Sequence, residues 1–142
     1  MRRYLVVANQ TLGGEHLAER VREDIAREPC VFHIVVPATP SDEHLTWTEG
    51  EATAVARHRL DLALAQFHEL GAQADGEVGD GNPILAIEDA LRHGQFDEII
   101  LSTLPPSISR WLKLDLPSRV ASRFRLPVTH LVAEPKPASG DR

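Results

Sequence analysis

The stretch that decides the fold lies at positions 79–102 and reads GDGNPILAIEDALRHGQFDEIILS. Asn82 is suited to cap a helix and Pro83 to be its first residue, so a helix is predicted from Pro83 to His93. The apolar run Ile99-Ile100-Leu101 then indicates a buried strand within residues 97–102. A turn, a helix and a buried strand in this order form one unit of a parallel α/β sheet.

The same pattern extends in both directions along the chain. Strands are predicted over residues 4–8, 31–36, 72–78, 97–102 and 128–132. Helices are predicted over residues 15–28, 48–70, 83–93 and about 118–125. Alternating strands and helices at crossover length predict a three-layer α/β/α fold with a five-stranded, parallel, doubly wound, Rossmann-like sheet.

The longest predicted helix has the clearest local signals. Its apolar residues fall on one stripe, and Gly71 stands where a glycine commonly follows the end of a helix. The stripe consists of Ala52, Ala56, Leu60, Ala63, Phe67 and Leu70.

Length and composition indicate one globular domain. The chain has 142 residues, of which 42% are hydrophobic and 25% charged. We expect a single domain over residues 1–134. The last segment, residues 135–142, is polar and rich in proline, and we expect it to be a disordered tail.

Charge and cysteine content exclude several classes. The formal charge is −6, from 15 basic and 21 acidic residues, so the chain is not expected to bind nucleic acid. The single cysteine, Cys30, cannot form an internal disulfide and is expected to be buried and inert. No apolar stretch reaches the roughly 20 residues that span a bilayer. We therefore expect a cytoplasmic protein without a membrane partner.

Catalytic and metal motifs are absent from the sequence. None of the seven histidines has the spacing of a zinc site. Serine nucleophile elbows, Walker A loops and G-x-G-x-x-G fingerprints are also missing. No catalytic or metal-binding residue is assigned, and a binding protein is favoured over an enzyme.

Ligands of open parallel sheets bind beyond the carboxyl ends of the strands. The segments at that edge include Asn9-Gln10-Thr11, Pro37-Ala38, Gly79–Pro83 and Ser102–Leu116. Taken together, they resemble the universal stress protein family, which shares its fold with the adenine nucleotide alpha hydrolase-like proteins. The resemblance covers residues 3–134.

In that family, a Gly-Asp-Pro-like turn precedes the third helix and a Pro-Val strand closes the sheet. This chain has Gly79–Pro83 for the turn and Pro127-Val128 for the strand. The family's first strand usually ends near an aspartate that faces the nucleotide, and Asn9 stands at that place. The resemblance also implies a homodimer formed through the fifth strand, Val128–Val132.

The family's phosphate loop has the pattern G-x2-G-x9-G-(S/T). Its positions fall here on Ser102, Pro105, Asp115 and Leu116, so every signature residue is replaced. Glycine lets the backbone come close to phosphate oxygens, proline cannot donate a hydrogen bond, and a carboxylate repels an anion. No cofactor is assigned, and ATP or another adenine nucleotide bound in the standard way is disfavoured.

The candidate ligand-binding residues come from the segments at this edge. They are Asn9, Gln10, Thr11, Gly79, Asp80, Gly81, Asn82, Ser102, Thr103, Ser107, Ser109, Arg110 and Lys113. Structural roles remain open for several of them. Asn9 is suited equally to capping a turn, and Asp80 to forming one. Ser107 or Ser109 is suited to capping a short helix with Arg110 and Lys113 on its solvated face.

Three functions follow from these observations. The first is a universal stress protein-like binding and regulatory module that takes a small anionic or nucleotide-like ligand. The second is a weak nucleotide hydrolase that uses Asp80 and Asp115. The third is a ligand-free domain that binds an unknown protein partner, with Leu104, Trp111 and Leu114 filling the crevice.

Overall fold

A computed structural model of the chain describes residues 1–39, 48–106 and 109–133. Its strands are β1 (Arg2–Val7), β2 (Cys30–Pro37), β3 (Gln73–Gly79), β4 (Glu98–Thr103) and β5 (Val128–Val132). Its helices are α1 (Glu15–Arg27), α2 (Glu49–Glu69), α3 (Pro83–His93), α4 (Arg110–Lys113) and α5 (Leu116–Arg123). None of these helices is both long enough and apolar enough to cross a membrane.

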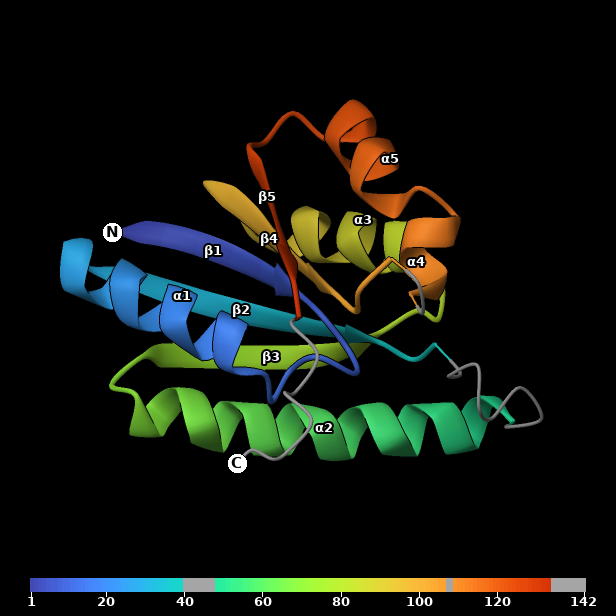
Figure 1. Cartoon of the computed structure of the whole chain (residues 1–142), viewed down its shortest axis with the longest axis horizontal. Coiled ribbons are helices and arrows are strands. Elements are labelled where there is room, and N and C mark those ends of the chain that lie inside the picture. Colours follow the sequence, from blue (N-terminus) through green and yellow to red (C-terminus); the bar gives the residue numbers. More distant parts are fainter. Residues whose placement is uncertain (40–47, 107–108, 134–142) are drawn as a thin grey trace.

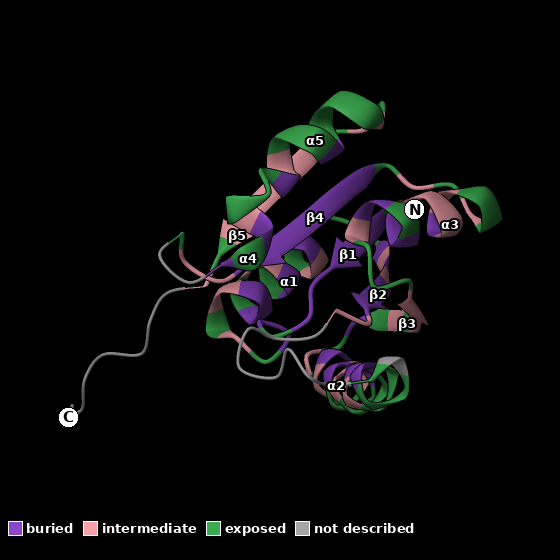
Figure 2. Ribbon diagram, turned by 90° about the vertical axis from the view of Figure 1, so that its right-hand side faces the viewer, coloured by how far each residue is buried: buried purple, intermediate pink, exposed green. Residues whose placement is uncertain are grey.

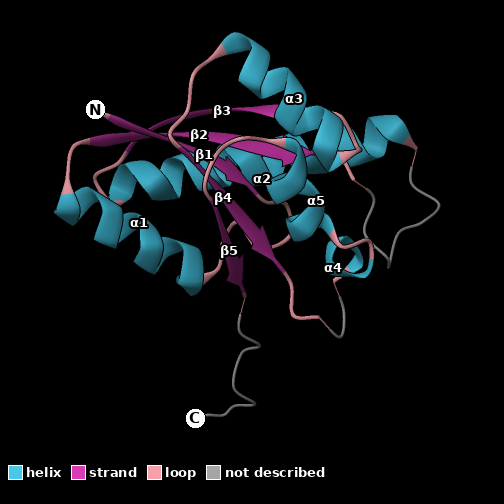
Figure 3. Cartoon of the chain, turned by 90° about the horizontal axis from the view of Figure 1, so that it is seen from above, coloured by secondary structure: helices cyan, strands magenta, loops and turns pink. Residues whose placement is uncertain are grey.

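The five strands form one parallel sheet in the order β3-β2-β1-β4-β5 (Figure 3). Helices α1 and α2 cover one face of the sheet, and α3, α4 and α5 cover the other (Figure 1). The predicted three-layer, doubly wound architecture is confirmed. The chain reverses its winding at β1 and β4, the place where such sheets bind ligands.

Alternation along β1 produces the two cores. Tyr4 and Val6 face α1 and α2, whereas Leu5 and Val7 face the opposite helical layer. Strand β4 is buried along its whole length, which Figure 2 also shows. Because β1 and β4 are covered on both faces, each contains an uninterrupted apolar run, Tyr4–Val7 in β1 and Ile99–Leu101 in β4.

The helix ends follow the local signals in the sequence. Thr48 forms a capping box with Glu51 at the start of α2, and Gly71 has a φ of +93° after its end. Asn82 caps α3 by accepting a hydrogen bond from the amide of Ile84 at 2.9 Å. The predicted bounds of α3 are those of the structure.

Two boundaries differ from the prediction at the carboxyl side of the chain. Helix α5 begins at Leu116 and ends at Arg123, each two positions before the predicted bound, and α4 is the short helix that the sequence left open. Asp115 separates them with a left-handed backbone, φ 57° and ψ 40°. The predicted tail, residues 135–142, lies outside the described residues.

A buried carboxylate links four elements at the amino ends of the strands. Glu98 of β4 accepts hydrogen bonds from Arg2 of β1 at 2.9 Å and Arg20 of α1 at 2.7 Å. It also accepts one from Thr129 of β5 at 2.6 Å. Arg20 further holds Asp24, whose side chain is fully buried. Charged groups this far from water are stable only with such partners.

We expect Glu98→Gln to lower the free energy of unfolding by about 2 kcal/mol at neutral pH, because it breaks charge-assisted hydrogen bonds. Burial alone would raise the pKa of Glu98, but the bonds from Thr129, Arg2 and Arg20 outweigh it and hold the pKa below its ordinary 4.5. The stabilisation is therefore complete above pH 4.5 and is lost as the pH falls through the lower folded-state pKa. Urea unfolding at several pH values measures both effects.

Glu15→Gln is the control for this prediction. Glu15 pairs with Arg22 on the surface of α1, so its loss should cost less than about 1 kcal/mol. Equal losses in the two variants would show that the Glu98 contacts do not stabilise the fold.

Candidate functional site

The carboxyl ends of β1, β2, β3 and β4 meet at one edge of the sheet, and the predicted site residues follow them. Backbone bonds hold the adjoining segments together. The amide of Ala8 donates to Val35 at 3.4 Å, and the amide of Ala38 donates to Gly79 at 3.1 Å. The Thr39 hydroxyl donates to the carbonyl of Gly81 at 2.7 Å. The edge is therefore a connected surface.

Thr11 and Ser102, two predicted site residues, meet between β1 and β4. Their hydroxyl oxygens lie 2.6 Å apart, and both side chains are buried. Nε2 of His16, from the first turn of α1, lies 2.7 Å from the Ser102 oxygen. Sequence analysis considered His16 only as a metal ligand and did not place it here.

Asn9 ties the ends of the two neighbouring strands together. Its buried amide donates to the carbonyl of Pro37 at 2.7 Å, and its side-chain oxygen accepts a hydrogen bond from Arg59 of α2. Asn9 thus bridges β1 and β2 and orients a guanidinium group. Gln10 is exposed in the turn that follows.

Arg59 is another residue at this edge that sequence analysis missed. Its side chain is half-buried, and burial lowers its pKa. Within the described residues it pairs with no carboxylate, and its printed bond is to the neutral amide of Asn9. The available signal was its place beside Leu60 of the buried stripe, a position from which a long side chain can reach past the helix.

The turn between β3 and α3 is formed by its own side chains. Asp80 accepts a hydrogen bond from the amide of Asn82 at 2.8 Å, so it acts as a turn residue, and both side chains are exposed. Gly79 packs closely, because a Cβ there would lie 2.8 Å from Cβ of Ala86. A Cβ on Gly81 would lie 3.0 Å from the carbonyl oxygen of Ala38.

The segment after β4 forms the short helix α4. Buried Ser109 caps it by accepting from the amide of Leu112 at 3.1 Å, while Arg110 and Lys113 are exposed. This is the capping role that the sequence left open. Thr103 is turned toward β5, where its hydroxyl lies 2.8 Å from Nε2 of His130. Ser107 lies outside the described residues.

A cavity of about 410 Å³ opens between the β3–α3 turn and α4. Trp111 and Leu114 line its wall, and Leu114 is 55% exposed, so these side chains border the space and leave it open. The lining residues are Thr39, Gly81, Asn82, Pro83, Arg110, Trp111, Leu114, Leu116 and Arg119. Within the described residues, no cluster of histidine, cysteine and carboxylate side chains is suited to hold a metal ion.

Comparison with known proteins gives matches of structure alone. No family model and no curated protein matches the sequence. A universal stress protein from Archaeoglobus fulgidus matches with a TM-score of 0.63 at 15% identity, over 92% of this chain and 93% of that one. A universal stress protein from Archaeoglobus fulgidus in complex with dAMP gives a TM-score of 0.61 at 18% identity, over 92% of this chain and 96% of that one.

A universal stress protein family protein from Arabidopsis thaliana with AMP bound matches with a TM-score of 0.67 at 14% identity, over 99% of this chain and all of that one. The chain has the universal stress protein fold. At this level of identity, the likeness establishes the architecture and leaves the ligand to be argued from the site.

The residues at the phosphate-loop positions of the universal stress protein pattern differ in conformation and in bonding. Asp115, which occupies a glycine position, is left-handed, the backbone state that glycine adopts most easily. Ser102, at another glycine position, is buried and bonded to Thr11 and His16. In this chain the turn into α5 is therefore left-handed, and the hydroxyl of Ser102 is engaged within the protein.

The left-handed backbone at Asp115 predicts the effect of substitutions there. Asp115→Val should lower the free energy of unfolding by about 1–2 kcal/mol, because a β-branched residue fits this conformation poorly. Asp115→Gly should not lower it. Urea denaturation measures both, with Ser118→Val on exposed helical backbone of α5 as the control, expected to cost less than about 0.5 kcal/mol. Equal costs for the two valine variants would contradict a left-handed Asp115.

Proposed function

We propose that this chain is a universal stress protein-like binding and regulatory module that takes a small anionic or nucleotide-like ligand at the carboxyl edge of its sheet, acting in the cytoplasm. Two fold neighbours are recorded with AMP and dAMP. The observation that carries the proposal is the guanidinium of Arg59 at this edge, bonded to Asn9.

A cation removed from water costs free energy unless an anion compensates it. Burial lowers the pKa of Arg59, which reports this cost. Elsewhere in the chain, buried arginine heads meet carboxylates, as Arg20 meets Asp24 and Glu98. Within the described residues Arg59 has no such partner. A ligand phosphate or carboxylate would supply the missing charge through charge-assisted hydrogen bonds.

The altered loop favours a ligand with few phosphates. Pro105 and Pro106 have no amide to donate, and the hydroxyl of Ser102 is engaged by Thr11 and His16. The carboxylate of Asp115 adds repulsion at the third glycine position. These features oppose a triphosphate cradle, whereas a single phosphate on Arg59 needs none of them. We therefore propose a nucleoside monophosphate, or an anion of similar size, over ATP.

Arg59→Gln should weaken AMP binding at least about tenfold, since it removes the positive charge that meets the phosphate. Stability without ligand should stay the same or rise by up to about 1 kcal/mol, because a desolvated cation is removed. Isothermal titration calorimetry gives the affinity and thermal unfolding without ligand gives the stability.

Arg57→Gln is the matched control, because Arg57 is an exposed arginine on the same helix. It should leave AMP affinity unchanged. Equal AMP affinities of the Arg59 variant and the original protein would refute the proposed role of Arg59. A low micromolar affinity for ATP would refute the view that the loop disfavours triphosphates.

We further propose that the module is a homodimer through β5. The two edge strands of the sheet differ in character. Strand β3 carries Asp75 and Glu77, charges that discourage edge-to-edge pairing, whereas β5 is uncharged and ends in Val132, 38% exposed. An uncharged edge is better suited to pair with its twofold mate.

Val132→Lys should shift the protein from dimer to monomer, because it places a charge on that edge, one in each chain. Light scattering after gel filtration measures the mass against the 15.7 kDa of one chain. Leu62→Lys, at an exposed position of α2, is the control and should leave the mass unchanged. A monomeric original protein would contradict the proposal.

A further inference from the structure

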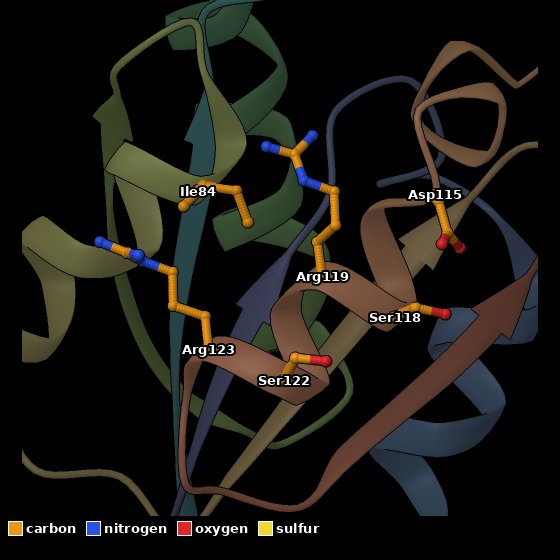
Figure 4. Close-up of a pocket in the computed structure, with 6 residues that line it drawn as sticks. All are labelled: Ile84, Asp115, Ser118, Arg119, Ser122 and Arg123. Atoms are coloured by element: carbon orange, nitrogen blue, oxygen red, sulfur yellow. The ribbon is translucent and has the colours of Figure 1, made fainter.

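Two adjoining cavities lie beside α3 on the face of the sheet away from α2. The smaller is the cavity of about 410 Å³ at α4, and the larger, of about 580 Å³, lies along α5 (Figure 4). The larger is lined by Ile84, Asp115, Ser118, Arg119, Ser122 and Arg123. Arg119 belongs to the walls of both, so the two spaces meet at its side chain.

The arginines of α5 face this groove. Arg119 and Arg123 are four residues apart, one helical turn, and Figure 4 shows both guanidinium groups on the α3 side of α5. The carboxylate of Asp115 lies away from them in the same view. Arg123 is neutralised by Glu88 of α3. Within the described residues, Arg119 has no ion pair, so its charge is available at the junction of the cavities.

The smaller cavity offers an apolar wall beside that charge. The indole of Trp111 and the side chains of Leu114 and Pro83 line it, together with the polar backbone of the β3–α3 turn. A flat aromatic group is suited to such a wall. The larger cavity presents hydroxyls and charged groups, which suit a polar arm such as a sugar.

We propose that this groove binds a small molecule with two arms joined by an anionic diphosphate bridge, the chemistry of a dinucleotide, with the bridge on Arg119. The smaller cavity has a volume within the range of small-molecule pockets, about 300–1,000 Å³, and the larger is an open, shallow depression beside it. A ligand with one terminal phosphate fills only one of them. A bridging diphosphate puts the anion at the junction, where the planar fork of Arg119 can bind two oxygens at once.

The groove uses a different arginine, from the opposite helical layer, than the site proposed at Arg59. Arg59 comes from α2, on one face of the sheet, whereas the groove is lined mainly by α3, α4 and α5 on the other (Figure 1). The two arguments rest on different arginines, although the smaller cavity reaches the same edge of the sheet through Thr39, Gly81 and Asn82. A variant of one site can therefore be compared with a variant of the other.

Titration calorimetry with diadenosine diphosphate, NAD and AMP tests the proposal. The original protein should bind diadenosine diphosphate at least about tenfold more tightly than AMP. Arg119→Gln should lose at least about tenfold in affinity for diadenosine diphosphate, and Arg119→Lys should lose less, because it keeps the charge without the fork. NAD has the same diphosphate bridge and a different second arm. Its affinity should also be highest for the original protein, lower for Arg119→Lys and lowest for Arg119→Gln.

The control is Arg92→Gln. Arg92 is an exposed arginine on α3 that pairs with Asp89 and lines neither cavity, so its loss should change no affinity. Arg59→Gln should also leave binding of the dinucleotide unchanged, whatever it does to AMP. If Arg59→Gln did not change the affinity for AMP, the site proposed at Arg59 would be refuted, but the proposal for the groove would not.

Three results would overturn the groove proposal. One is a dinucleotide affinity no higher than that of AMP, including no binding. Another is undiminished dinucleotide affinity in Arg119→Gln. The last is loss of dinucleotide binding in Arg59→Gln with none in Arg119→Gln, which would place the ligand at the edge of the sheet.

Discussion

The buried carboxylate of Glu98 is the interaction on which the arrangement of this domain depends. It takes hydrogen bonds from β1, α1 and β5 while standing at the start of β4, so four elements meet on one charge. A desolvated carboxylate is costly without such donors. Burial of Glu98 is therefore favourable only when β1, α1 and β5 are packed around the start of β4. The register of β1 between β2 and β4 then places all strand ends at the opposite edge.

Charged side chains are paired differently at the two edges of the sheet. At the amino edge, arginines meet carboxylates in a closed network, which includes the buried Asp24. At the carboxyl edge, Arg59 meets only the amide of Asn9 among the described residues. Networks of paired charges stabilise a fold, whereas an uncompensated buried charge is stabilised when a ligand of opposite charge binds. This asymmetry is the physical basis for locating function at the carboxyl edge.

The loop after β4 shows that backbone conformation and ligand chemistry can separate. Asp115 keeps a left-handed turn at a glycine position of the universal stress protein pattern, and α5 begins directly after it. The amides and open space that glycines provide for phosphate are gone. In their place, Ser102 is bonded within the protein and the segment folds into α4, whose tryptophan borders a cavity. The left-handed turn thus leads into α5 while the residues before it are bonded within the protein.

Local chemistry allowed the sequence by itself to determine the five strands, the long helices and their caps. The proline and asparagine at the start of α3, and the glycine after α2, act on backbone groups a few residues away, so their effect can be predicted without knowing the rest of the chain. The grouping of the segments after β1 and β4 also followed from parallel strands sharing one edge, whereas the contact of Thr11 with Ser102 was not predicted. Only the tertiary structure decided that Arg59 reaches Asn9, 50 positions away, and that His16 reaches Ser102, 86 positions away. The apolar stripe of a helix indicates which face packs against the sheet, but which distant residue a long side chain then reaches depends on how the elements are arranged in space.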